Sequence, residues 1–160
     1  MIGARLLRLV WSVVVVALVG CGGTVTSGAT PATSTNYVQQ YANAGAALDT
    51  ATTTWDTLGQ SLVVAGTNTV ANEAPIDAAY AQALQAFNTS LLSIQFPASA
   101  QNDVRAVVNA AAIVRRDLAG VASGAVTTAQ FASDESNLQA AINLVQRDLG
   151  LGSSTPIAGG

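Results

Sequence analysis

The side chains of this chain that could perform chemistry are carboxylates, hydroxyls, arginines and one cysteine, because the sequence contains no His and no Lys. A Ser–His–Asp triad, a Schiff-base lysine and the usual zinc sites of His and Cys each lack a required member. The Glu-x-x-His pattern of di-iron helical bundles is excluded for the same reason. The sequence therefore predicts a protein that is not an enzyme.

The adjacent acidic pair Asp134-Glu135 is the first of two charged clusters with a potential role. The spacing of apolar residues around it places Glu135 on the inner side of a helix, between Phe131 and Leu138. A buried carboxylate there would have a raised pKa and could be functional. In the alternative interpretation the helix is rotated slightly, and both acids stay near solvent at the positive N-terminal end of that helix.

The second cluster, Arg115-Arg116-Asp117, either binds an anionic head group or forms an exposed face with a weak Arg–Asp pair. The overall charge argues against a binding surface made of many basic residues. Without Arg5 and Arg8 of the leader, four Arg stand against nine Asp and Glu, a net charge of −5. Nucleic-acid binding, which needs a basic patch, and a polybasic lipid-binding surface are therefore not expected.

The first 21 residues have the organisation of a secretory leader. Arg5 and Arg8 form a basic region without acids, and residues 9–19 are almost wholly apolar. A transmembrane helix would need about 17–25 apolar residues, and this run is shorter. It ends in Leu18-Val19-Gly20-Cys21, followed by two glycines.

Leu18-Val19-Gly20-Cys21 resembles the lipobox of bacterial lipoproteins, in which the signal peptide is cleaved before the cysteine and the thiol carries diacylglycerol. The resemblance implies a covalent lipid with acyl chains such as palmitate on Cys21, and no other cofactor. It also implies that the protein lies on the extracytoplasmic face of the cell membrane, since two or more acyl chains anchor a protein stably. The composition, rich in Ala, Val, Thr and Gly and free of Lys, is similar to that of exported actinobacterial and mycobacterial proteins.

The chain divides into four parts. Residues 1–20 are the signal peptide, and residues 21–34 are the lipidated cysteine with a flexible Gly/Thr/Ser-rich tether. Residues 35–151 form the folded domain, and residues 152–160 are expected to be a disordered tail.

Four segments of the domain have apolar residues at helical spacing. The first, residues 35–65, ends before Gly66, and its threonines near position 52 favour a local bend. Residues 67–74 are predicted to be a polar loop, with Pro75 in the first turn of a second helix that ends before Pro97. The apolar stripe of the first segment consists of Tyr37, Tyr41, Ala44, Leu48, Ala51, Trp55, Leu58 and Leu62.

The third segment is predicted to run from about residue 98 to Gly120 or Gly124, and the fourth from Thr127 to about residue 149. Thr127 and Gln130 have the spacing of a capping box, Val126 and Phe131 that of a hydrophobic staple. Gly150 followed by Leu151 is typical of a C-terminal glycine cap. Because short connections favour antiparallel neighbours, the sequence predicts an all-α protein, an antiparallel up-down four-helix bundle.

This topology gathers aromatic side chains at both ends of the bundle. Tyr37, Tyr41 and Phe96 meet at the end joined to the tether, which we expect to be the ligand- or partner-binding site; the alternative is that these rings only close the bundle. Trp55 and two further rings, Tyr80 and Phe131, meet at the other end. The expected function is membrane-anchored, non-enzymatic binding of an envelope or exported protein. The alternative is a carrier of an apolar small molecule within the bundle, either lipid or haem, whose iron Tyr can ligate.

Replacing Cys21 with Ala tests the anchor. If Cys21 is acylated, the variant should lose labelling by a fatty-acid probe and move from the membrane to the soluble fraction, because no acyl chain then holds it. Labelling and fractionation of the two proteins expressed side by side give the comparison. Labelling of the variant at the unmodified level would refute lipidation at this position.

Overall fold

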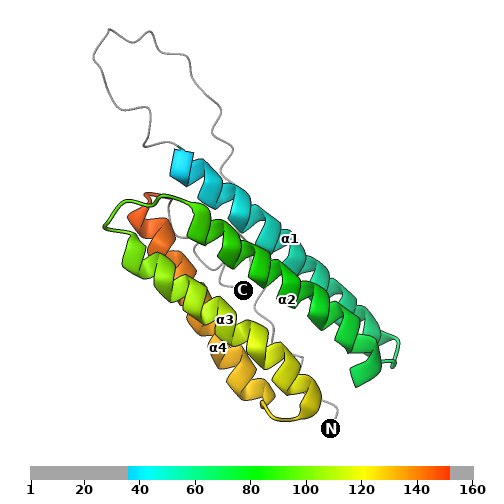
Figure 1. Cartoon of the computed structure of the whole chain (residues 1–160). Helices are drawn as coiled ribbons and strands as arrows, with labels where there is room; N and C mark the ends of the chain where they lie inside the picture. Colours follow the sequence, from blue (N-terminus) through cyan, green and yellow to red (C-terminus); the bar gives the residue numbers. More distant parts are fainter. Residues whose placement is uncertain (1–35, 152–160) are drawn as a thin grey trace, which may run out of the picture.

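The computed structural model describes residues 36–151, which form four helices and, within this range, no strand. The helices are α1 (Asn36–Val64), α2 (Val70–Ser93), α3 (Gln101–Ser123) and α4 (Thr128–Asp148). Successive helices run antiparallel (Figure 1), which confirms the predicted all-α up-down bundle. The predicted leader, Cys21, the tether and the tail from residue 152 lie outside the described residues.

The helices are not equally close to one another. The backbones of α1 and α2, of α2 and α3, and of α3 and α4 approach closely. Within the described range no Cα atom of α1 lies within 8 Å of one in α4. Large side chains bridge this wider seam: the Tyr41 hydroxyl donates a long hydrogen bond of 3.5 Å to the Ile142 carbonyl, and the rings of Trp55 and Phe131 are 5.9 Å apart.

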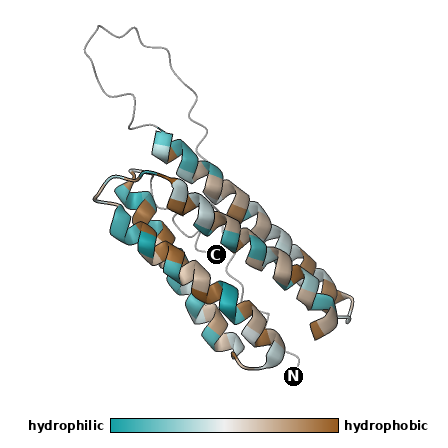
Figure 2. Ribbon diagram, viewed as in Figure 1, coloured by the Kyte–Doolittle hydropathy of each residue, from teal (hydrophilic) through white to brown (hydrophobic). Residues whose placement is uncertain are grey.

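The bundle axis is filled by apolar side chains from all four helices. The fully enclosed ones include Leu84 and Leu91 of α2, Val107 and Val114 of α3, and Leu138 and Val145 of α4. Most positions of the predicted stripes are buried, and Figure 2 shows the same separation of apolar and polar faces. Leu58 is an exception, because it belongs to the predicted stripe of α1 and yet is exposed. No helix of the described range combines the length and the apolarity that crossing a bilayer requires.

Glycines end three of the helices, as the sequence predicts. Gly66, Gly124 and Gly150 have φ values of 66°, 76° and 70°, in the left-handed region that glycine adopts without strain. At each of them the next amide donates back over the last turn; the Leu151 amide, for example, donates to the Gln146 carbonyl at 2.8 Å. These are Schellman caps, which satisfy carbonyl groups that the helix leaves free.

The predicted start of α2 is wrong. The helix begins at Val70, so most of the segment predicted as a loop, residues 67–74, is helical, and Pro75 lies inside the helix. Thr69 is the reason: its side chain accepts a hydrogen bond from the Asn72 amide, and its carbonyl accepts from Glu73 at 2.9 Å. This N-cap starts the helix five residues before the proline.

The other helix starts differ from the predictions in smaller ways. Thr127 caps α4 by accepting from the Gln130 amide at 3.1 Å, as predicted. The Gln130 side chain, which would complete the capping box by accepting from the Thr127 amide, donates to Asp134 at 2.7 Å. α3 begins at Gln101, not near residue 98. α1 is continuous through its threonines, whose hydroxyls donate to carbonyls one turn earlier, as Thr52 does to Leu48.

Two glycines inside helices have opposite surroundings and give a matched stability test. A Cβ atom on Gly120 would overlap the Cγ2 methyl of Val126, whereas a Cβ on Gly45 would meet nothing within 4 Å. Gly120→Ala should therefore lower the free energy of unfolding by about 1–3 kcal/mol. Gly45→Ala should raise it by about 0.5–1 kcal/mol, because alanine favours the helix. Urea denaturation measures both, and an equal sign for the two changes would contradict the packing at Gly120.

Candidate functional site

The three aromatic residues predicted to form the site at the first end of the bundle do lie together. The ring centroid of Phe96 is 6.5 Å from that of Tyr37 and 6.2 Å from that of Tyr41. Tyr41 and Phe96 are buried, however, and only Tyr37 is partly exposed. Burial also raises the pKa of the Tyr41 phenol, so its hydroxyl stays protonated.

This burial favours the packing role of the cluster. Tyr41 already uses its hydroxyl within the bundle, and Phe96 lies in the turn between α2 and α3, where it covers the end of the core. A partner would reach these two rings only if the end of the bundle opened. Of the three predicted contact residues, Tyr37 alone offers surface to a ligand.

The second aromatic cluster, at the other end, also consists of three rings, and these come from three different helices. Trp55 of α1 stacks on Tyr80 of α2, with ring centroids 4.8 Å apart, and also contacts Phe131 of α4. The indole N–H of Trp55 donates to the carboxylate of Asp77 at 2.7 Å, within the buried interior. Nothing in the sequence spacing pointed to Asp77, because its partner is on another helix.

An open groove lies on the outer side of this cluster, between α1 and α2. Its volume is about 380 Å³, and its lining is mainly apolar. Leu58, Pro75 and Ala79 are exposed lining residues, so the groove opens to solvent and is not an internal cavity. It is lined by Ala51, Thr54, Trp55 and Leu58 of α1 and by Pro75, Ile76, Ala79 and Tyr80 of α2.

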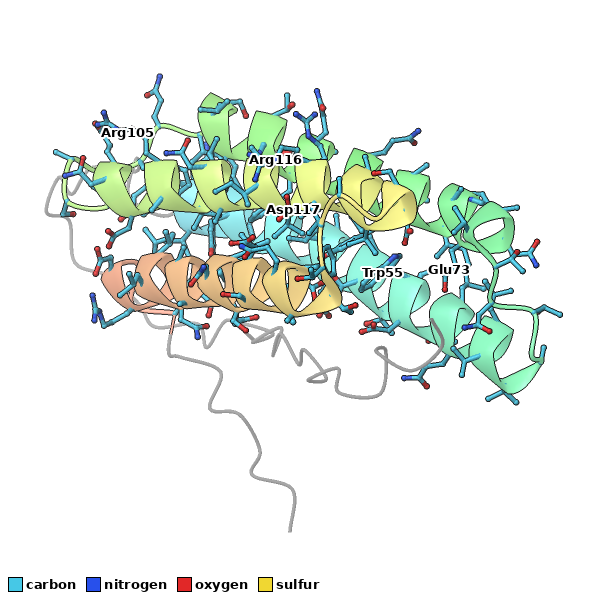
Figure 3. The ribbon with its side chains drawn as sticks, turned by 90° about the horizontal axis from the view of Figure 1, so that it is seen from below. Trp55, Glu73, Arg105, Arg116 and Asp117 are labelled. Carbon is cyan, nitrogen blue, oxygen red and sulfur yellow. The ribbon has the colours of Figure 1, made fainter. Side chains whose placement is uncertain are left out.

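Next to the groove, the α1–α2 hairpin extends past the turn that joins α3 and α4 (Figures 1 and 3). We call residues 58–76 of this hairpin the tip; Glu73 lies on its projecting part (Figure 3). The tip exposes apolar side chains that a bundle would normally bury. These are Leu58 (45% exposed), Val63 (42%), Val64 (89%) and Val70 (57%).

The acid predicted to be buried on the fourth helix is not buried, and a buried acid lies on α3 instead. Glu135 is partly exposed on α4, whereas Asp117 of α3 is 1% exposed. Burial raises the pKa of the Asp117 carboxyl, the neighbouring Asp134 raises it further, and Arg116 opposes both. The pKa of Asp134 is lowered, mainly by the hydrogen bond from the Gln130 side chain. Asp134 thus interacts with Asp117 of α3, and both Asp134 and Glu135 remain partly exposed, as in the alternative interpretation.

The arginines of the second charged cluster are used within the fold. Arg116 contacts the Asp117 carboxylate at 3.2 Å from an exposed position (Figure 3), and Arg115 donates to the side chain of Gln85 on α2. The Arg116–Asp117 contact is the weak pair expected if this cluster forms an exposed face and does not bind a head group. No group of three or more His, Cys, Asp or Glu within residues 36–151 is arranged to hold a metal ion.

Comparisons of the chain with protein-family models, with curated proteins and with solved structures found no match.

The raised pKa of Asp117 predicts that the stability of the fold depends on pH. Its pKa in the folded protein is raised above the unfolded value of about 3.9, so the folded state retains a proton that the unfolded chain has lost. Its contribution to stability therefore falls as the pH rises above about 4. Asparagine resembles the protonated acid, so Asp117→Asn should remove this fall and be more stable than the unmodified protein at neutral pH.

Urea midpoints measured from about pH 4 to neutral pH check this prediction. Asp134→Asn is the companion variant, because it removes the neighbouring carboxylate and should make the fall shallower. The lowered pKa of Asp134 acts in the opposite sense, but only below its unfolded value of about 3.9, outside the compared range. Parallel pH profiles for the unmodified protein and Asp117→Asn would show that the buried carboxyl does not titrate differently in the two states.

Proposed function

We propose that this chain is an exported lipoprotein, anchored to the cell membrane by diacylglycerol on Cys21, whose four-helix bundle binds a protein partner outside the cytoplasmic membrane. The leader and the sequence Leu18-Val19-Gly20-Cys21 support the anchor. The observation that carries the binding role is the tip, where an apolar groove and exposed valines adjoin each other. Exposed apolar patches of this kind mark interaction sites.

The position of the tip fits an anchored protein. α1 begins 15 residues after Cys21, so the start of α1 is the end that the anchor holds near the membrane. At 1.5 Å per residue, α1 carries the tip about 43 Å away from that end. The groove is therefore presented to other proteins at a distance from the bilayer.

The alternative function is transport of an apolar small molecule. The groove favours it in one respect, because a volume of about 380 Å³ is within the range of small-ligand sites. Carriers bury most of the ligand surface, however, and this groove is open on one side. The enclosed axis of the bundle is occupied by side chains such as Leu84 and Leu138.

Photo-crosslinking separates the two functions in the full-length protein, expressed and processed in its own host. A crosslinking residue is placed at Leu58 on the tip, at Leu92 on α2 and at Leu144 on α4, all of which are exposed. A protein-binding module should give a discrete protein adduct from at least one of these positions. Absence of adducts from all three, with a small molecule retained in native mass spectrometry, would replace the protein-binding role by the carrier role.

A further inference from the structure

The basic residues of the bundle are confined to one of its two hairpins. All four arginines of the described residues are on α3 and α4. The α1–α2 hairpin has no basic residue and carries four acids: Asp49, Asp56, Glu73 and Asp77. Glu73 lies on the tip, Asp56 precedes it by two residues, and the buried Asp77 accepts a hydrogen bond from the tryptophan that lines the groove. The charged side chains that reach the surface of this hairpin, Asp49, Asp56 and Glu73, are therefore all acidic.

We propose that the tip and its groove bind a cationic amphipathic helix of a partner protein. This deepens the protein-binding function proposed above and depends on it. The lining of the groove includes two small residues, Ala51 and Ala79, which allow a third helix to approach closely. Leu58 and Ile76 provide apolar contacts for the bulky side chains of that helix. Lysines or arginines beside its apolar face would then meet the acids of the hairpin.

The other occupants fit less well. A second copy of the chain would bring two acidic hairpins together without a compensating base, which like-charge repulsion disfavours. An anionic lipid surface would be repelled for the same reason. The segments of this chain outside the structure are poor candidates, because residues 22–35 and 152–160 are mostly Gly, Ser, Thr and Ala. Their only larger aliphatic side chains are those of Val25 and Ile157.

Trp55 provides the readout for a test. It is the only tryptophan after residue 21, and it lines the groove, so its fluorescence reports on occupancy. The mature chain, with Cys21→Ser to keep it soluble, is titrated with a synthetic amphipathic helix of Leu and Lys. Two further peptides are compared with it: the same helix with Glu in place of Lys, and a scrambled Leu/Lys peptide without an apolar face.

The Leu/Lys helix should change the Trp55 signal in a saturable way and bind more weakly as salt is added, because salt screens exposed charges. The Leu/Glu and scrambled peptides should bind at least tenfold more weakly. Leu58→Ser should weaken binding about fivefold, since it removes part of one leucine's burial. Leu92→Ser, which removes an exposed leucine of α2 outside the groove, should leave the affinity unchanged.

Three results would each overturn the inference. Equal binding of the Leu/Lys and Leu/Glu helices would remove the role of charge. An equal loss of affinity for the Leu/Lys helix in Leu58→Ser and Leu92→Ser would show that the tip is not the binding site. No response to any peptide would exclude a cationic helix as occupant. In each case protein adducts in the crosslinking experiment would leave the protein-binding function intact, whereas their absence would refute that function independently.

Discussion

The contacts of Trp55 are the interaction on which the far half of the bundle depends. Its ring stacks on Tyr80, touches Phe131 across the wider seam and donates its N–H to Asp77, so one side chain connects α1 with α2 and α4. Cys21 is the only cysteine, so no disulfide can close the chain, and surface ion pairs contribute little. Because α1 and α4 do not approach closely along their backbones, this aromatic contact and that of Tyr41 hold the fourth side of the bundle together.

Local sequence patterns predicted the helices well, and the register between helices poorly. The apolar spacing and the glycines at positions 66, 124 and 150 act within one helix, so they can be recognised without knowing the fold. The start of α2 was missed because Pro75 is a strong signal for a first turn, whereas the cap made by Thr69 is a weaker one. The buried acid of α3, Asp117, was missed because it lies beside the apolar stripe of its helix, and only the packing of a neighbouring helix decides whether such a position is covered.

The early start of α2 also explains why the sequence did not reveal the tip. A helix beginning at Pro75 would have left the end of α1 without a partner, although it would still contain the residues of α2 that line the groove. With α2 beginning at Val70, the hairpin is a paired structure, and α1 and α2, at 29 and 24 residues, are longer than α3 and α4, at 23 and 21. The greater length of α1 contributes to the projection of this hairpin past the α3–α4 turn. The aromatic cluster of Tyr37, Tyr41 and Phe96 lies at the opposite end, where it mostly packs the core.

The separation of charge between the hairpins gives the tip a selectivity that an apolar groove alone would lack. Apolar contacts are non-directional, so an uncharged groove would accept many helices, including the tips of other copies of the chain. The acids of α1 and α2 add a cost for acidic partners and copies and a gain for basic ones. Long-range attraction would raise the rate of encounter, and burial of apolar side chains in the groove would set how long the partner stays. An apolar groove beside acidic residues would therefore discriminate against other copies of this chain and still accept a cationic helix.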